Sequence, residues 1–308
     1  MLRQALLLAS HNQTLTRLVT TAPGVGALVG RFAAGETTSD AVAATRDLVA
    51  VGREVSLDHL GEDTLDREQA DATRGAYVSL LRALADEGLA AHAEVSVKLS
   101  AVGQALPGDG PKIATENAHA ICAAAQDAGT TVTLDMEDHT TTDLTLGTLA
   151  TLRSDYPDTG GVLQAYLHRT EGDCRDLAYE GSRIRLCKGA YNEPESVAIQ
   201  PRHDVDLAYV RCLEVLMAGS GYPMLATHDP RLIALGTDLA TRRGRTPDSY
   251  EFQMLYGVRP SAQQALVSQG ATMRVYVPYG SEWYGYLVRR MAERPANLLL
   301  GARALVGL

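Results

Sequence analysis

The chain has 308 residues, of which 45% are hydrophobic and 21% are charged. This composition is that of a globular protein with a sizeable core, and it excludes disordered, fibrous and membrane-spanning chains. The formal net charge of -9, with no long basic run to offset it, argues against nucleic acid as a general partner.

The N-terminal part of the chain is predicted to be helical. Residues 1–35 form short segments broken by Gly24, Gly26 and Gly30, and residues 39–51 form a further helix with Ser39 as its N-cap. We therefore expect residues 1–53 to be a helical extension of the domain that follows.

A repeated unit of strand, loop and helix fills residues 54–308. The predicted strands are residues 54–60, 94–100, 131–137, 162–167, 183–188, 224–228, 250–255 and 273–277. Helix starts between them include Thr64, for a helix that ends at Gly88, and the pairs Asp229-Pro230 and Arg259-Pro260. Eight alternations predict a (β/α)8 TIM-type barrel. A doubly wound sheet is the alternative, but no Gly-x-Gly-x-x-Gly follows the first strand.

The predicted strands alternate between apolar and polar residues. In residues 94–100 and 131–137 one face is apolar, and the other carries Lys98, Asp135 and Glu137 near the strand ends. The apolar faces must pack against the helices, so the polar faces are expected to point into the barrel or towards its mouth. Gln164 in the fourth strand, and Arg183 and Arg185 on one face of the fifth, are expected to converge on the same mouth.

The last predicted helix, residues 281–293, carries polar side chains on one stripe. Glu282, Tyr286, Arg289, Arg290 and Glu293 recur at spacings of three, four or seven. Two adjacent guanidinium groups suit a small carboxylate, because each guanidinium can bind a carboxylate through two hydrogen bonds. A solvated basic helix end is the alternative. We expect a distorted barrel in which this helix lies over the mouth as a lid.

Three polar features admit more than one role. Asp135 to His139 contain four possible metal ligands, but consecutive residues cannot all face one point, so we expect no metal. Lys98 is either a Schiff-base lysine or, as we favour, a cation held by Asp135 or by a substrate carboxylate. His228 is a pocket ligand or a core histidine, and Asp229 beside it is a helix N-cap.

Eight short segments, one in each barrel unit, carry a further pattern. They are Ser-Leu-Asp-His-Leu-Gly-Glu (56–62), Ser-Val-Lys-Leu-Ser (96–100), Leu-Asp-Met-Glu (134–137), Leu-Gln-Ala-Tyr (163–166), Arg-Leu-Cys-Lys-Gly-Ala-Tyr (185–191), Ala-Thr-His (226–228), Tyr-Glu-Phe-Gln-Met-Leu-Tyr-Gly (250–257) and Tyr-Leu-Val-Arg-Arg (286–290). Together and in this order they resemble the proline dehydrogenase family, which includes a domain of bifunctional proline utilisation A proteins. The span resembles the short monofunctional bacterial members.

The resemblance implies an enzyme that uses FAD to oxidise L-proline to Δ1-pyrroline-5-carboxylate, by hydride transfer to flavin N5, and passes the electrons to a membrane quinone. By the same resemblance, the proline carboxylate would be held by Lys98, Arg289 and Arg290. The proline ring would be walled by Leu255, Tyr276 and Tyr286.

The resemblance also implies roles at the flavin. Asp135 would orient the basic cluster, and Arg185 would lie beside N5 as a catalytic group. Further flavin contacts would come from Met136, Gln164, Lys188, Gly189, Ala190, Thr227 and His228. Glu293 would pair with Arg289 and keep the last helix in place.

The cysteines and both chain ends bear on location and partners. Cys122, Cys174, Cys187 and Cys212 form no Cys-x-x-Cys pair, which favours a reducing compartment. His11 interrupts the apolar start too early for a signal peptide, so we expect a cytoplasmic protein. Peripheral membrane contact and self-association are open roles for the apolar residues 297–308, with packing on the barrel favoured. The alternatives in function are a Schiff-base lyase that uses Lys98 and a barrel that only binds an amino acid.

Overall fold

The computed structural model describes residues 29–293, except the side chains of residues 289–293. Eight parallel strands close into a barrel in which each strand pairs with the next and β8 pairs with β1. The strands are β1 (Glu54–His59), β2 (Ala93–Val97), β3 (Val132–Leu134), β4 (Gly160–Gln164), β5 (Arg183–Cys187), β6 (Tyr222–Ala226), β7 (Glu251–Leu255) and β8 (Met273–Tyr279). The predicted (β/α)8 barrel is confirmed, and each observed strand overlaps one of the predicted ranges.

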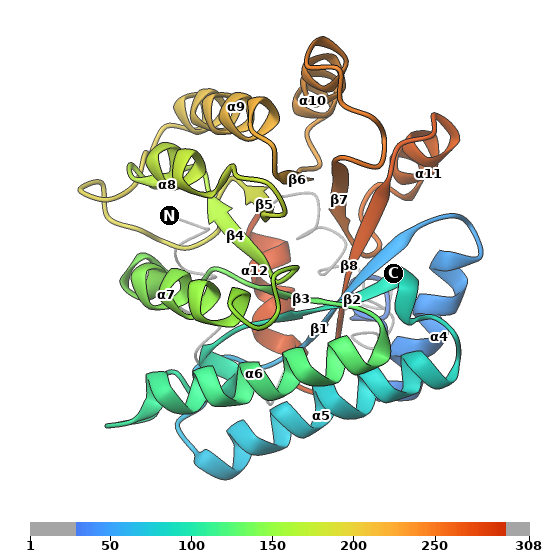
Figure 1. Cartoon of the computed structure of the whole chain (residues 1–308), viewed down its shortest axis with the longest axis vertical. Coiled ribbons are helices and arrows are strands. Elements are labelled where there is room, and N and C mark those ends of the chain that lie inside the picture. Colours follow the sequence, from blue (N-terminus) through green and yellow to red (C-terminus); the bar gives the residue numbers. More distant parts are fainter. Residues whose placement is uncertain (1–28, 294–308) are drawn as a thin grey trace, which may run out of the picture.

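Each strand is followed by a helix, and most of these helices surround the barrel (Figure 1). They are α5 (Arg67–Asp86), α6 (Gly110–Ala128), α7 (Thr142–Arg153), α8 (Thr170–Leu177), α9 (Arg202–Ala218), α10 (Pro230–Arg242), α11 (Pro260–Ser268) and α12 (Trp283–Glu293). A further helix, α4 (Thr38–Val49), precedes β1. It packs against β1, β8 and α5, and so covers the seam where the barrel closes.

The start of α4 corrects one predicted N-cap. Thr37 caps the helix: its Oγ1 accepts a hydrogen bond of 3.2 Å from the backbone N–H of Asp40, and the Asp40 carboxylate accepts one of 2.9 Å from the Thr37 N–H. This reciprocal pair satisfies two N–H groups that the first turn leaves free. The prediction of Ser39 was wrong because Ser39 already lies inside the first turn.

Of two further predicted helix starts, one was wrong and one is confirmed. Asp66 caps α5 by accepting a 2.7 Å bond from the Glu68 N–H, so the helix begins three residues after the predicted Thr64. At α10, Asp229 accepts a 3.0 Å bond from the Arg231 N–H, which confirms its predicted role as the cap. In both helices a carboxylate satisfies a free N–H of the first turn.

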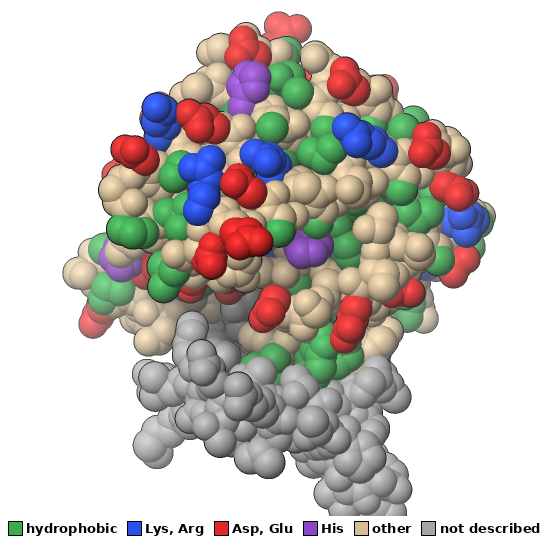
Figure 2. All heavy atoms as spheres, turned by 90° about the horizontal axis from the view of Figure 1, so that it is seen from below, with side chains coloured by type: hydrophobic (Ala, Val, Ile, Leu, Met, Phe, Trp, Pro, Cys, Tyr) green, Lys and Arg blue, Asp and Glu red, His purple; other side chains and the backbone are tan. Residues whose placement is uncertain are grey.

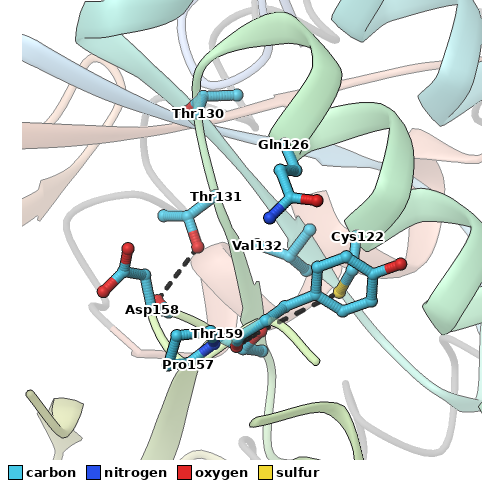
Figure 3. A pocket seen from close by; sticks show the side chains of 9 residues that line it. Cys122, Gln126, Thr130, Thr131, Val132, Pro157, Asp158 and Thr159 are labelled. Atoms are coloured by element: carbon cyan, nitrogen blue, oxygen red, sulfur yellow. Dashed lines mark hydrogen bonds between the residues drawn. The ribbon is translucent and has the colours of Figure 1, made fainter. Parts of the chain in front are cut away.

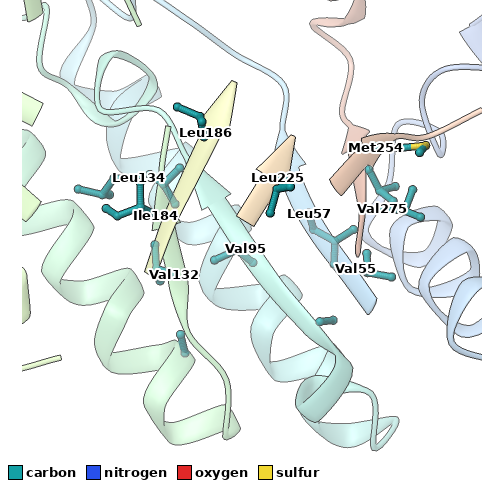
Figure 4. Packing of buried hydrophobic residues seen from close by; sticks show 14 of the residues in the cluster. Val55, Leu57, Val95, Val132, Leu134, Ile184, Leu186, Leu225, Met254 and Val275 are labelled. Atoms are coloured by element: carbon teal, nitrogen blue, oxygen red, sulfur yellow. The ribbon is translucent and has the colours of Figure 1, made fainter. Parts of the chain in front are cut away.

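The hydrophobic core lies between the strands and the surrounding helices (Figure 4). This core contains the outward-facing side chains of the strands, which include Val55, Leu57, Val95, Val132, Leu134, Ile184, Leu186, Leu225, Met254 and Val275. Alternation along each strand then turns the intervening residues inward. The predicted apolar outer face is therefore confirmed, and the barrel interior is left to polar and charged side chains.

Helix α12 does not lie in the outer ring. Figure 1 shows it across one end of the barrel, inside the circle of the other helices. Its residues Trp283 and Leu287 belong to a buried cluster with Leu60, which directly follows β1, and the half-buried Val258 after β7 packs on this cluster. Both contacts lie at the carboxyl ends of the strands, so the predicted helix over the mouth is confirmed.

The surface of the described part is mixed in charge. On the face in Figure 2, acidic and basic side chains are interspersed among neutral and hydrophobic ones. Large hydrophobic side chains are exposed at scattered positions, which include Val51, Leu65, Leu144, Tyr179 and Leu207. Within residues 29–293, no helix is both long and apolar enough to cross a membrane. The predicted boundary between residues 53 and 54 stays a prediction.

Candidate active site

Arg185 occupies the centre of the barrel interior. The side chain projects from β5 and is 5% exposed. Its Nε donates to Gln253 Oε1 at 2.6 Å, Nη1 donates to Ser96 Oγ at 2.9 Å and Asp135 Oδ1 at 2.6 Å, and Nη2 donates to Ser56 Oγ at 3.0 Å and Glu94 Oε1 at 3.3 Å. These five bonds use all five N–H groups of a guanidinium. These hydrogen bonds therefore fix the orientation of the Arg185 guanidinium.

Asp135 links Arg185 to Tyr276 at the mouth. One oxygen of the Asp135 carboxylate takes the Arg185 bond, and the other accepts a 2.6 Å bond from the Tyr276 hydroxyl. The Arg185 guanidinium also lies 5.3 Å from the centre of the Tyr276 ring, within range of a cation–π contact. Three predicted site residues from β5, β8 and the end of β3 thus meet in one network.

Lys98 has a different partner from the one considered in the sequence. Its Nζ donates to both carboxylate oxygens of Asp58, at 2.8 and 2.7 Å. Asp58 lies near the end of the neighbouring strand β1, and both side chains are buried. Burial alone would lower the pKa of Lys98, but the charges of Asp58 and Asp135 outweigh it and raise this pKa. The interpretation of Asp135 as the holder of Lys98 was wrong, and the lysine is held as a cation.

The ends of β3 and β4 place Met136, Glu137 and Gln164 close together. Met136 and Gln164 are buried, and the Gln164 side-chain Nε2 donates to the backbone oxygen of Glu137 at 2.7 Å. The Glu137 carboxylate turns to Ser100, whose N–H and hydroxyl donate to it at 3.1 and 2.5 Å. Burial raises the pKa of Glu137 to about 7, against the opposing effect of the Ser100 bonds.

The possible metal ligands that follow β3 point to different partners. Asp135 meets Arg185 and Glu137 meets Ser100, whereas Asp138 accepts a 2.8 Å bond from the Thr140 N–H. His139 pairs with the buried Glu193. Among the described residues, no group of three or more His, Cys, Asp or Glu side chains is arranged to hold a metal ion.

Lys188 lies at the mouth in a cluster of alternating charge. Its Nζ is 2.5 Å from Asp206 Oδ1 and 3.5 Å from Asp229 Oδ2. Arg231 contacts the same two carboxylates, at 2.8 and 2.6 Å. The cations Lys188 and Arg231 are thus balanced by two carboxylates at the edge of the site, where the Lys188 side chain remains 34% exposed.

Gly189 has a backbone that only glycine adopts without strain. Its φ is +112°, and a Cβ there would lie 2.2 Å from the Tyr166 ring. The Tyr166 N–H donates to the backbone oxygen of Lys188 at 2.9 Å, which holds the two segments together. Gly189 and Ala190 are half-buried, so the missing side chain lets the loop after β5 lie directly against Tyr166.

Thr227 and His228 follow β6 at the same end of the barrel. The Thr227 Oγ1 accepts a 3.1 Å bond from the Asp229 N–H, and the His228 Nε2 accepts one of 3.0 Å from the N–H of Leu255. Leu255 is half-buried at the end of β7. His228 therefore has a structural partner on the next strand and still lies at the mouth.

Helix α12 carries the remaining predicted site residues, and the structure describes the side chain of only some of them. Tyr286 is buried in the cluster that joins α12 to Leu60. Arg289, Arg290 and Glu293 belong to α12, but their side chains lie outside the described residues. The predicted carboxylate-binding pair, and its contact with Glu293, therefore stay predictions.

A separate hollow lies at the opposite end of the barrel (Figure 3). Its volume is about 70 Å³, and its walls are Cys122 and Gln126 of α6, residues 130–132 at the start of β3, and residues 156–159 just before β4. Within it, Thr131 Oγ1 donates to the backbone oxygen of Asp158 at 2.9 Å. Barrel enzymes carry their sites at the carboxyl ends of the strands, so this hollow is not the candidate site.

Comparison with known proteins identifies the family. A family model described as proline dehydrogenase matches residues 41–299. Proline dehydrogenase 2 of Bacillus subtilis is 38% identical over 269 residues, which cover 87% of each chain, and the proline dehydrogenase of Deinococcus radiodurans is 39% identical over 272 residues, which cover 88% of this chain and 87% of that one. The chain belongs to the proline dehydrogenase family.

A solved structure of this family also shares the fold. Proline utilization A from Bdellovibrio bacteriovorus, inactivated by N-propargylglycine, matches with a TM-score of 0.78 and 25% sequence identity. The match covers 86% of this chain and 32% of that one, so the chain spans about a third of that relative. The resemblance found in eight sequence segments, and the enzyme class that it implied, are confirmed at the level of the family.

Several residues of this proline dehydrogenase network were not predicted from the sequence. They are Ser56, Asp58, Glu94, Ser96 and Gln253, which hold Arg185 or Lys98. Ser96 lies in the strand whose inward polar face was recognised, and Ser56 and Asp58 alternate with Val55 and Leu57 in the same way. Their inward direction was predictable, whereas their choice of partner was not.

Proposed function

We propose that this member of the proline dehydrogenase family uses FAD to oxidise L-proline to Δ1-pyrroline-5-carboxylate and passes the electrons to a quinone. The observation that carries the proposal is the buried network of Arg185, Asp135 and Tyr276 beside the Lys98 cation. Such a site offers fixed positive charge to an anionic substrate and to a cofactor that gains negative charge on reduction.

The residues at the strand ends fit a flavin. Arg185 and Lys188 supply cations, Thr227 supplies a hydroxyl, and the absent side chain of Gly189 permits a close approach of the backbone. We propose that FAD is held by Met136, Gln164, Arg185, Lys188, Gly189, Ala190, Thr227 and His228. When bound, FAD supplies the hydride acceptor at N5. Arg185 would act there through its charge, because its five N–H groups already have acceptors.

The substrate proposal places the proline carboxylate near Lys98, Arg289 and Arg290. The pKa of Lys98 is raised, so the group stays cationic and can attract a carboxylate even though Asp58 holds it. The same protonated state makes Lys98 a poor nucleophile, which weighs against the Schiff-base alternative. The proline ring would lie against Leu255, Tyr276 and Tyr286, and these contacts would orient its C5–H bond for hydride transfer.

A visible spectrum tests this proposal most directly. Protein loaded with FAD is expected to absorb as an oxidised flavoprotein and to lose that absorption on anaerobic addition of L-proline. D-Proline, which has the opposite configuration at the carbon that bears the carboxylate, serves as the control. Protein that takes up no FAD, or that keeps its oxidised spectrum with L-proline, would contradict the proposal.

A second experiment uses N-propargylglycine, the compound that inactivated the proline utilization A of the solved structure. N-Propargylglycine is a secondary amine with a carboxylate, so it shares the two groups by which proline would be recognised. We expect it to inactivate the FAD-loaded protein over time, and L-proline to protect against it. Inactivation at the same rate with saturating L-proline would place its reaction outside the proposed site.

The proposal also includes a location and an electron acceptor. We propose a cytoplasmic protein with peripheral contact at the inner face of the membrane, where a quinone is available. Proline-dependent reduction of a water-soluble quinone, measured with and without lipid vesicles, tests both parts. Turnover with a dye but with no quinone would remove the quinone from the proposal. Oligomerisation remains open to measurement by light scattering.

A further inference from the structure

Glu94 lies at the floor of the barrel and gathers donors from several strands. Its side chain is 2% exposed. Oε1 accepts bonds from Ser56 Oγ and Thr133 Oγ1, both at 3.1 Å, and from Arg185 Nη2 at 3.3 Å. Oε2 accepts a 2.7 Å bond from Arg183 Nη2. The prediction of Arg183 at the mouth was wrong, because it is the first residue of β5 and lies at the floor. One carboxylate thus connects β2 to β1, β3 and β5.

The charges around Arg185 balance only while Glu94 carries its negative charge. Arg183 and Arg185 contact Glu94, and Arg274 contacts Glu251 at 2.8 Å. Three guanidinium groups therefore face these two carboxylates at the floor, and Asp135, on the side of the mouth, supplies the third negative charge by its contact with Arg185. Burial alone would raise the pKa of Glu94, but Arg274, Arg183 and Arg185 together lower it to about 2, so Glu94 is ionised.

The next carboxylate in the network is Asp135, on the side of the mouth. It takes the Nη1 bond of Arg185, whereas Glu94 takes an Nη2 bond on the other side of the same guanidinium. Arg185 is thus held between a carboxylate at the floor and one at the mouth. Its position, and the share of its charge that is neutralised from below, depend on Glu94.

From this arrangement we infer that Glu94 is a positioning residue, which fixes the Arg185 guanidinium and sets how much of its positive charge acts on the flavin. The inference rests on the proposed function, because it assigns a role towards bound FAD. Glu94 lies beneath Arg185 and acts through it. Loss of its negative charge leaves the site more positive, which favours the reduced and more negative flavin.

The test is a redox titration of the FAD-loaded protein, followed by its visible spectrum with indicator dyes and without proline. In Glu94→Gln the side chain keeps its size and loses its charge. We expect the midpoint potential of the flavin to shift to a more positive value than in the wild type. A potential equal to that of the wild type, or more negative, would overturn the inference.

A pair of uncharged substitutions provides a matched control. If Glu94→Gln does not fold, this pair still tests whether the contacts that hold Arg185 set the flavin potential. Ser56→Ala and Thr133→Val each remove one hydroxyl that donates to Glu94 Oε1 at 3.1 Å. Only Ser56 also accepts a bond from Arg185. Ser56→Ala should shift the potential in the positive direction, because the Arg185 guanidinium loses one acceptor that compensates its charge, and Thr133→Val should leave it unchanged. Equal shifts in the two variants would contradict a role through Arg185.

The outcomes separate this inference from the proposed function. Wild-type protein that binds no FAD would overturn both. Wild-type protein that is bleached by L-proline, together with a Glu94→Gln variant of unaltered potential, would overturn only the role of Glu94. A positive shift in a protein that L-proline does not reduce would support the role of Glu94 towards the flavin and contradict proline as the substrate.

Discussion

Lys98 donates to both carboxylate oxygens of Asp58 across the adjacent ends of β2 and β1, at 2.8 and 2.7 Å. The two side chains are 10% and 1% exposed, so neither charge is well solvated. A buried charge without a counter-ion is strongly unfavourable, and each of the two residues therefore depends on the other. The pair also keeps a cation at the mouth when no anionic ligand is bound.

The first prediction concerns the energetic coupling of this pair. Lys98→Met leaves Asp58 buried without its counter-ion, and the free energy of unfolding should fall by about 3–5 kcal/mol. The double variant Lys98→Met with Asp58→Leu removes both charges and should lose much less. Urea unfolding of the wild type, both single variants and the double variant measures the coupling. Losses that simply add would show that the ion pair is not coupled.

The second prediction compares two tyrosines of β8. Tyr276→Phe removes the 2.6 Å hydrogen bond to Asp135, and it should lower the free energy of unfolding by about 1.5–3 kcal/mol because the acceptor is charged. The Tyr279 hydroxyl is buried and has no hydrogen-bond partner among the described residues, so Tyr279→Phe should change stability little.

The same pair of variants reports on activity. With Tyr276→Phe, Asp135 loses a fixed partner at the mouth, so kcat/KM for proline should fall. Tyr279→Phe should leave it close to the wild-type value, because the Tyr279 hydroxyl is not bonded to the network. Steady-state kinetics measure kcat/KM for proline in both variants. Equal values in the two variants would place Tyr276 outside the site.

The third prediction concerns the glycine after Lys188. Gly189→Ala adds a Cβ that would lie 2.2 Å from the Tyr166 ring, so the ring or the loop has to move. We expect low FAD content and a lower melting temperature. Gly181→Ala is the control: its φ is also positive, at +79°, but no atom lies within 4 Å of the added Cβ.

Gly181→Ala should therefore show only the backbone strain of a positive φ, on the order of 1–2 kcal/mol. FAD content is measured from the flavin absorbance for each mole of protein, and melting temperature by calorimetry. A Gly189→Ala protein with the FAD content and melting temperature of Gly181→Ala would mean that the close contact with Tyr166 is easily relieved.

The fourth prediction is a pH dependence of stability that arises from Glu137. Its pKa is raised from 4.5 to about 7 in the folded protein, chiefly by burial, so the folded state holds this proton more tightly than the unfolded state. The contribution of Glu137 to stability is then fully present below pH 4.5 and is lost as the pH rises through 7. At about 1.36 kcal/mol for each pKa unit, the loss is on the order of 3 kcal/mol.

Glu137→Gln, which cannot ionise, provides the comparison. The difference in unfolding free energy between this variant and the wild type should grow in favour of the variant from pH 4.5 to pH 7 and then level off. Denaturant unfolding at a series of pH values measures it. A difference that stays constant over this range would mean that Glu137 titrates at its ordinary pKa.

Much of the fold was predictable because it depends on patterns that are local in the chain. The repeated strand, loop and helix gave the barrel, and alternation along residues 94–100 and 131–137 gave the direction of Lys98 and Asp135. Helix starts were less certain, because Ser39 and Thr37 are both good caps and only the bond to Asp40 distinguishes them.

The position of α12 was predicted from its chemistry. A stripe with Tyr286 and two arginines is not the apolar face of a helix that packs on the outside of a barrel, and α12 indeed lies over the mouth. Helix α4 then covers the seam between β8 and β1. The position of α4 depends on how the barrel closes, and no sequence pattern within residues 38–49 predicts it.

The sequence by itself determined the family, the barrel and the inward direction of its charged side chains, since a two-residue period fixes which way each residue of a strand points. Only the tertiary structure decided which charges meet. Lys98 pairs with Asp58, 40 residues away, and Arg185 meets Glu94 from β2 and Gln253 from β7. These choices depend on the stagger of strands that adjoin only once the barrel has closed, and buried charges must then satisfy one another inside it.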